Sequence, residues 1–137
     1  MPNNFHVYVN NNVASFLYDR PECRSTGGKG DHKCDVILVE FTAQETSKLW
    51  IIECKSSVSR QEASKAIEQI EGCHRVINNA GKWEIKNCVI ANSFTQDAAI
   101  SLKKKQILHL QFNNNTNNEE QRNIINAVKK IKGCADF

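Results

Sequence analysis

Apolar residues recur along the chain with two different periods, and after residue 33 these periods divide it into strands and helices. Short runs rich in β-branched residues predict strands, because such side chains favour a pleated backbone. Longer stretches with apolar residues three and four positions apart predict helices that pack on one face. The predicted strands are 34–42, 49–56, 86–93 and 107–112, and the predicted helices are 59–77, 95–105 and 117–132.

Local signals mark where several of these elements begin. Ser59 with Glu62 has the spacing of a capping box, in which each side chain meets the other residue's free amide, and Thr116 with Glu119 repeats it. The polar turn 43–48 between the first two strands predicts a hairpin.

The first 20 residues carry two conflicting patterns. The stretch "FHVYV" has strand character, but the apolar residues also share one face of a helix, and on this basis we expect a helix. The residues of that helix face are Phe5, Val9, Val13, Phe16 and Leu17.

The order of elements predicts an α/β fold with a mixed central β-sheet flanked by α-helices. A chain of 137 residues has the size of one domain, so we expect a single domain over 1–137, with a core at about 25–112 and a C-terminal helix at 117–132. Its composition, 40% hydrophobic and 24% charged, is typical of a globular protein. Neither a membrane-spanning run nor a signal peptide is visible, which predicts a cytoplasmic protein, or a nuclear one in a eukaryote.

The chain has six cysteines, which raises the question of disulfides. Cys34, Cys54 and Cys88 lie inside apolar strand patterns, where reduced cysteine behaves as a small buried hydrophobe. No CxxC pair and no zinc-type spacing is present. We therefore expect reduced cysteines and no structural metal.

A carboxylate and an amine stand where an apolar strand ends. Glu53 and Lys55 follow Ile51 and Ile52, and because side chains alternate along a strand they share one face. The predicted hairpin brings Asp35, at the head of the preceding strand, near Glu53. Two neighbouring carboxylates repel unless a cation lies between them, and Mg²⁺ is held by such oxygen ligands together with substrate phosphate. A lysine beside the ion is suited to activating water or stabilising charge on a phosphate.

The competing interpretation is an ordinary surface ion pair, worth under about 1 kcal/mol. Three features favour chemistry: the pair ends an apolar strand, an aspartate heads the preceding strand, and an amphipathic helix follows at once.

The stretch "GDHKCDVILVEFTAQETSKLWIIECKSS" resembles the PD-(D/E)XK nuclease superfamily, which has a restriction-endonuclease-like core, and in outline it is similar to small Holliday-junction resolvases. The resemblance covers about residues 25–112. It implies that Asp35, Glu53 and the backbone carbonyl of Cys54 bind Mg²⁺, for which Mn²⁺ can substitute. It also implies that Lys55 is the catalytic lysine and that Gln69, on the following helix, points back toward the site.

The sequence departs from this pattern in its first part. Many members have a glutamate on the first helix as a further ligand, and no acidic residue is well placed for that role here. His6 is a weak substitute, and Asp31, in a glycine-rich turn, is a weaker rival to Asp35.

The glycine-rich stretch "STGGKGDHK" is not a Walker A loop, because glycine follows its lysine where Ser or Thr would be required. Arg24, Lys29, Lys33 and Ser56 are candidate contacts to nucleic-acid phosphates. The segment from Leu102 to Gly133 carries seven basic residues against two acidic ones, which is suited either to solvated helix faces or to a phosphate-facing surface.

These features predict an Mg²⁺-dependent endonuclease that cuts double-stranded or branched DNA with weak sequence or structural selectivity, and by analogy a homodimer. One alternative is a catalytically inactive nuclease fold that serves in DNA binding or assembly. Another is a generic α/β domain with a surface ion pair.

Overall fold

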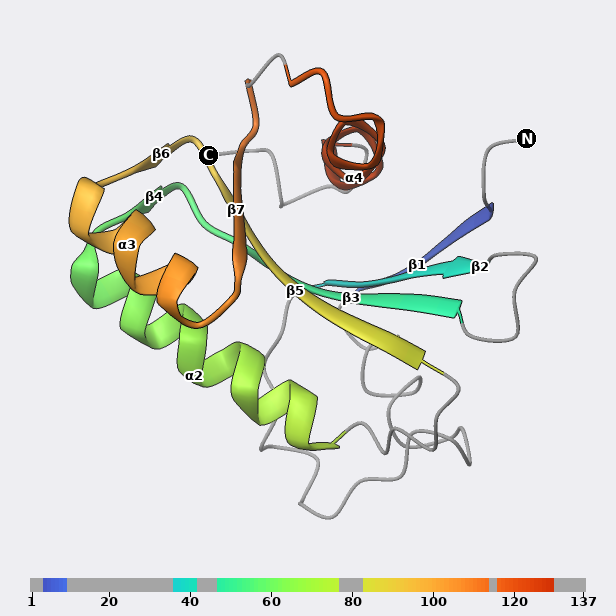
Figure 1. Cartoon of the computed structure of the whole chain (residues 1–137), viewed down its shortest axis with the longest axis horizontal. Coiled ribbons are helices and arrows are strands. Elements are labelled where there is room, and N and C mark those ends of the chain that lie inside the picture. Colours follow the sequence, from blue (N-terminus) through green and yellow to red (C-terminus); the bar gives the residue numbers. More distant parts are fainter. Residues whose placement is uncertain (1–3, 10–35, 42–46, 77–82, 114–115, 130–137) are drawn as a thin grey trace. The chain divides into compact units, whose positions relative to one another are not determined.

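The computed structural model describes residues 4–9, 36–41, 47–76, 83–113 and 116–129 (Figure 1). Its strands form a five-stranded sheet in the order β1-β2-β3-β5-β7 and a two-stranded sheet of β4 and β6. The strands are β1 (Asn4–Val9), β2 (Val36–Phe41), β3 (Ser47–Cys54), β4 (Ser57–Val58), β5 (Trp83–Ala91), β6 (Ser93–Phe94) and β7 (Leu108–Gln111). The helices are α2 (Arg60–Val76), α3 (Gln96–Lys104) and α4 (Glu119–Lys129).

The first three strands form an antiparallel group in which β2 lies between β1 and β3. The predicted hairpin of β2 and β3 is therefore confirmed. The helix expected near the N-terminus is wrong for Asn4–Val9, which is a strand paired with β2 along its whole length. Pairing with the exposed edge of β2 satisfies the backbone of this segment, and tertiary context of this kind overrides a weak helical periodicity.

The later strands run parallel. β5 pairs with β7 from Cys88↔Leu108 to Ala91↔Gln111, and the short strands β4 and β6 are parallel as well. Together with the antiparallel group they make a mixed sheet flanked by helices, as expected from the sequence. This architecture fits a restriction-endonuclease-like core.

The chain divides into two compact units. Unit 1 comprises Met1–Glu53 and Glu68–Asn87, and unit 2 comprises Cys54–Ile67 and Cys88–Phe137. The boundary between them follows Glu53, so it falls within the last two residues of β3.

The central strands are buried on both faces. The side chains from Val36 to Val39 in β2, Leu49 to Cys54 in β3 and Cys88 to Ala91 in β5 are all buried. Their sequences accordingly read as continuous apolar runs instead of alternating ones, as expected where both faces of a sheet are covered. Cys54 and Cys88 form no disulfide, and burial raises the pKa of the Cys88 thiol.

One face of α2 is buried through residues at helical spacing: Ala63, Ala66, Ile70 and Cys73. The expectation of reduced cysteines is wrong for Cys73, which is disulfide-bonded. Its partner lies outside the described residues. The apolar stripe of α2 indicated that this cysteine is buried, and burial of a thiol does not reveal whether a second cysteine lies against it.

The last helix begins two residues later than its predicted cap implies, at Glu119 instead of residue 117. The amide of Gln121 donates to Asn118 Oδ1 at 3.0 Å, so Asn118 caps α4. The capping box expected from Thr116 and Glu119 is wrong. Thr116 instead accepts a hydrogen bond from the Asn118 amide at 3.1 Å and thereby holds the capping residue in place. Of the described helices, none is long and apolar enough to span a membrane.

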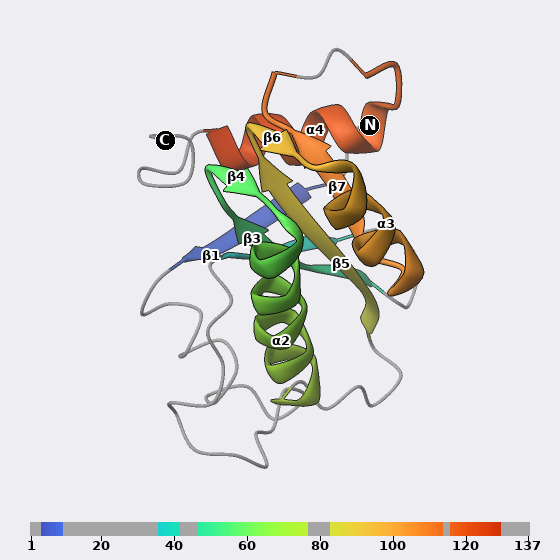
Figure 2. The same cartoon turned by 90° about the vertical axis from the view of Figure 1, so that its left-hand side faces the viewer.

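The carboxyl end of α3 is closed by a Schellman motif, after which the chain turns into β7, alongside α3 (Figure 2). The amide of Ile107 donates to the Leu102 carbonyl at 2.9 Å, and that of Gln106 donates to the Lys103 carbonyl at 3.0 Å. The accompanying apolar contact of this motif is provided by Leu102 and Ile107, both buried. Gln106 has a φ of 58°, in the left-handed region. It occupies the position of this motif that is usually glycine.

Replacing Gln106 by glycine is therefore expected to stabilise the protein. A non-glycine residue in the left-handed region costs about 1–2 kcal/mol, and the extra freedom of unfolded glycine offsets part of this gain. The free energy of unfolding should rise by about 0.5–1 kcal/mol in urea denaturation. Lys104→Gly, within the helix, is the matched control and should lower it by about 0.5–1 kcal/mol. A loss of stability in Gln106→Gly would contradict the assigned turn.

Candidate functional site

Glu53 is the one charged side chain that the described part of the chain buries completely. It lies near the end of β3, in unit 1, between the buried Ile52 and Cys54. Taking a carboxylate out of water costs several kcal/mol, and proteins tolerate it where the group is paired, hydrogen-bonded or coordinated to a metal ion. A glutamate at this position is therefore a strong candidate for a functional residue.

The hairpin fixes which residues of β2 lie opposite this end of β3. The pairs are antiparallel and run from Glu40↔Lys48 to Val36↔Ile52, which is the last described pair on this side. Asp35, which directly precedes Val36 in the chain, lies outside the described residues. The structure thus shows the strand pairing expected for the site, and it describes one of the two proposed carboxylates.

Unit 2 begins with the segment that carries Lys55. The side chain of Lys55 is half-buried, and its amide donates to the carbonyl of Ile90 at 2.9 Å. The amide of Asn92 donates to the carbonyl of Ser56 at 3.0 Å. From these bonds, the segment of Lys55 and Ser56 runs parallel to the segment of Ile90 and Asn92. The backbone around Lys55 is therefore held by the end of β5.

Polar residues gather where the parallel strands of unit 2 end. Ser56, Asn92 and Gln111 are all exposed, and Gln111 Nε2 donates to the Asn92 carbonyl at 3.5 Å. In parallel sheets the carboxyl ends of strands meet at one edge, where ligands commonly bind. We call this edge, defined by Lys55, Ser56, Asn92 and Gln111, the carboxyl edge.

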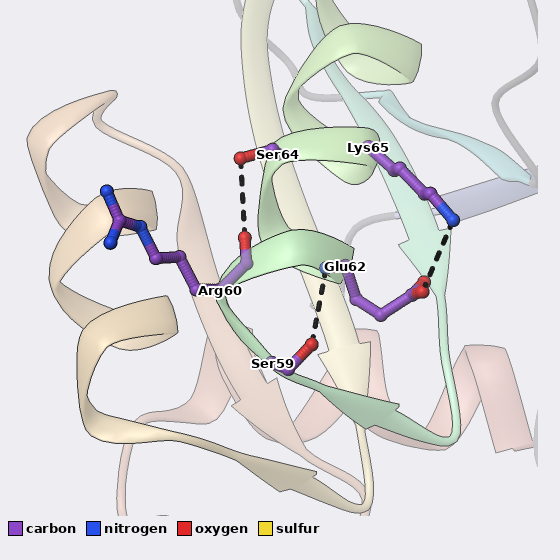
Figure 3. Close-up of polar contacts among 5 residues, drawn as sticks. All are labelled: Ser59, Arg60, Glu62, Ser64 and Lys65. Carbon is purple, nitrogen blue, oxygen red and sulfur yellow. Dashed lines mark hydrogen bonds and ion pairs between the residues drawn. The ribbon is translucent and has the colours of Figure 1, made fainter.

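The start of α2 follows directly after this edge (Figure 3). The amide of Glu62 donates to Ser59 Oγ at 3.4 Å, so Ser59 caps the helix as predicted. Glu62 Oε1 forms an ion pair with Lys65 at 3.6 Å. The capping half of the predicted box is therefore confirmed at Ser59. The helix holds the backbone that follows Lys55 in a fixed direction.

The start of α3 is polar and tightly connected. Thr95 Oγ1 donates to Asp97 Oδ1 at 2.6 Å and accepts from the Ala98 amide at 3.3 Å. The Thr95 hydroxyl has the largest effect on the Asp97 carboxyl and lowers its pKa. The Ala98 amide and the charge of Arg60 lower it as well, and Figure 3 shows Arg60 extending from α2 toward α3. Thr95 is the N-cap of α3, and Asp97 lies in the first turn of the helix with its carboxylate bound to the Thr95 hydroxyl and the Ala98 amide.

Among the remaining candidates, Gln69 is half-buried on α2 in unit 1, as expected for a residue at the edge of the apolar stripe. Arg24, Lys29 and Lys33 lie outside the described residues. Trp50 is part of the buried core, with an exposed fraction of 3%.

Sequence reasoning missed two features of the carboxyl edge. The parallel pairing of Ser57–Val58 with Ser93–Phe94 joins the segments after β3 and β5, and two-residue strands leave no periodic signal. Phe94 also packs edge-on against His109 of β7, with ring centroids 5.2 Å apart. A histidine within an apolar strand was the only hint of this contact.

The described residues contain no group of three or more histidine, cysteine, aspartate or glutamate side chains placed to hold a metal. A Mg²⁺ site does not require one, since this ion keeps several waters and is commonly held by one or two carboxylates. Of the candidate ligands, the Glu53 carboxylate and the Cys54 carbonyl belong to described residues, and both are hard oxygen groups of the kind that Mg²⁺ and Mn²⁺ prefer.

Comparison with known proteins adds little. No protein-family model matches the chain, and no curated protein matches it. The chain is similar to the crystal structure of a repair endonuclease from Pyrococcus abyssi, with 10% sequence identity and a TM-score of 0.36. The match covers 63% of this chain and 34% of that protein, so the chain spans about a third of its length. A likeness of this size carries no argument about the site.

The pKa of Asp97 should depend on the Thr95 hydroxyl. We expect Thr95→Ala to raise this pKa toward its ordinary value of 3.8, as measured by NMR titration of the carboxyl group. Because the folded-state pKa is lowered, the contribution of Asp97 to stability is present above its unfolded-state pKa. This contribution is lost as the pH falls through the folded-state value. An unchanged Asp97 pKa in Thr95→Ala would show that the hydroxyl is not the main cause.

Proposed function

We propose that this chain is a metal-dependent nuclease that hydrolyses phosphodiester bonds of nucleic acid, with DNA as the favoured substrate. The observation that carries the proposal is the complete burial of Glu53 at the end of β3, two residues before the half-buried Lys55. A surface ion pair, the competing interpretation, would leave the carboxylate in water. A buried acid followed by a basic residue at the end of a strand suits a site that binds a cation and an anionic substrate.

The second carboxylate of the proposed site is Asp35. The pairing of β2 with β3 reaches Val36↔Ile52. In this proposal the same register would continue by one position and match Asp35 with Glu53. Directly opposed residues of an antiparallel pair have Cβ atoms about 4.5–5.5 Å apart and point to the same face. That separation allows two carboxylates to share one divalent ion.

In this proposal Mg²⁺ would be held by Asp35, Glu53 and the carbonyl of Cys54. The bound ion would supply charge stabilisation for the phosphate and a lowered pKa for a water molecule. These donors fit the ion because all are oxygens, and the two carboxylates supply the negative charge that compensates it.

In this proposal Lys55 would provide the positive charge of the site. Its backbone is tied to Ile90, so its amine starts from a fixed point at the carboxyl edge. There it would orient an attacking water and stabilise the charge that develops on the phosphate. Gln69 would help to position that water, and Ser56, exposed beside Lys55, would donate a hydrogen bond to a neighbouring phosphate.

Removing the Lys55 amine should strongly slow cleavage and leave the fold intact. We expect Lys55→Ala to lower the rate of plasmid cleavage with Mg²⁺ or Mn²⁺ by about 100-fold or more, the usual effect of losing a group that stabilises the transition state. Lys65→Ala, which removes an exposed lysine paired with Glu62, is the matched control and should cleave normally. Wild-type activity in Lys55→Ala, with circular dichroism unchanged in both variants, would remove Lys55 from the mechanism.

Metal binding should depend on the two carboxylates and not on the amine. Titration calorimetry with Mn²⁺ is expected to show binding to the wild type and to Lys55→Ala, and loss of binding in Glu53→Gln and Asp35→Asn. Both substitutions keep the side-chain volume, so folding can be checked separately by thermal denaturation. A wild-type protein that binds no Mn²⁺ would leave a nuclease-like fold without this catalytic site.

A further inference from the structure

The positive charge of the chain is concentrated in unit 2. This unit contains ten lysine and arginine residues against five aspartate and glutamate residues, a net charge of +5. The remainder of the chain has eight basic and ten acidic residues, a net charge of −2, although the whole chain is only at +3. A charge separation of this kind favours an anionic partner on unit 2.

Within unit 2, the basic residues are densest at the carboxyl end of α3. Lys103, Lys104 and Lys105 are consecutive and exposed. No acidic residue stands three or four positions before any of them, so α3 itself supplies no compensating charge. The acid of this helix, Asp97, is in the first turn at its opposite end, where it accepts a hydrogen bond from the Ala98 amide.

In contrast to α3, helix α4 of unit 2 carries acidic residues that balance its basic ones. In α4, the basic residues Arg122 and Lys129 are balanced by Glu119 and Glu120 in the first turn. Such a mixed arrangement is typical of a solvated helix face. The excess charge of the described part of unit 2 therefore lies mainly at the end of α3.

The lysines project from a rigid support. The Schellman motif fixes the last turn of α3 through the hydrogen bonds of Gln106 and Ile107, and the buried Leu102 anchors it. One turn earlier, Ile100 is 49% exposed, and it is the large apolar side chain that the described residues leave most open to solvent. Ile100 shares a helix face with Lys103 and Lys104, three and four positions later.

Lysines in the last turn also complement the helix dipole, which accounts for basic residues at this position in many helices. The dipole does not account for an exposed isoleucine on the same face, or for the concentration of charge in this unit. An apolar side chain bordered by lysines fits the sugar and phosphate surface of a nucleic acid. One exposed isoleucine offers too little apolar area to insert into a lipid bilayer, so we favour the nucleic acid.

We propose that the carboxyl end of α3 is a second contact for the nucleic acid, where Lys103 and Lys104 bind backbone phosphates away from the bond that is cut. This inference rests on the proposed function, and it states which part of the protein would bind the nucleic acid beyond the bond that is cut. The end of α3 leads into the start of β7, whereas the carboxyl edge is at the other end of that strand. The four residues of β7 separate the two by about 13 Å at 3.3 Å per residue.

Binding without cleavage tests this contact. A fluorescently labelled 25-base-pair duplex is titrated with protein in EDTA, from about 50 to 200 mM salt, and the logarithm of the binding constant is plotted against that of the salt concentration. Lys103→Ala/Lys104→Ala should reduce the slope by about 2, one for each lost phosphate contact, for any duplex sequence. Arg122→Ala/Lys129→Ala removes the same charge from α4 and should keep the wild-type slope. Thermal denaturation checks that both variants are folded.

Three results would overturn the proposal. The first is a wild-type slope in Lys103→Ala/Lys104→Ala, and the second is an equal reduction in the α4 variant, which would show a response to net charge alone. The third is unchanged duplex binding together with weaker binding to vesicles containing phosphatidylserine, which would identify a membrane surface as the partner. The proposed function fails by a separate result, absence of metal-dependent cleavage, so failure of the α3 contact and failure of the proposed function are told apart.

Discussion

The structure depends on one constraint: a carboxylate is placed where the fold otherwise admits only apolar groups. β3 lies between β2 and β5, and its side chains from Leu49 to Cys54 are all buried, with Glu53 the charged one among them. An apolar residue at 53 would serve the core better, since burying a charge costs several kcal/mol before any compensation. In the proposed function, a divalent cation contributes this compensation. Because such an ion binds only the folded chain, it would also raise the stability of the protein.

The same constraint explains how few elements the site needs. In the proposed function, the carboxylates would come from Asp35 and Glu53, and the segment after β3 would add the Cys54 carbonyl and the amine of Lys55. The hydrogen bond of this segment to Ile90 and the cap of α2 at Ser59 fix the backbone on both sides of the amine. Under this proposal the chemistry would be concentrated at one strand end, and the rest of unit 2 would hold the substrate. The uneven distribution of charge between the units agrees with that division.

Much of this fold could be predicted from the sequence, because the strongly periodic segments dominate it. The hairpin, the two parallel strands and the three helices follow from apolar spacing, and the Ser59 cap follows from a local motif. The N-terminal strand could not be predicted, because its state is set by the free edge of β2. Asn118 replaced Thr116 as a cap because both are good capping residues and the choice depends on the loop before them. The disulfide at Cys73 depends on a contact distant in sequence. For the candidate site, the pattern predicts roles for Glu53 and Lys55, whereas the complete burial of Glu53 required the three-dimensional fold.

The most direct test is the position of a bound ion. A crystal soaked with Mn²⁺ should give an anomalous peak about 2.0–2.3 Å from one carboxylate oxygen of Glu53 and one of Asp35, with the carbonyl of Cys54 as a further ligand. A well-ordered Asp35 turned away from Glu53, with the Glu53 carboxylate satisfied by protein groups and no peak beside it, would contradict the proposed metal site. Glu53 would then be a structural residue, and the fold alone would remain.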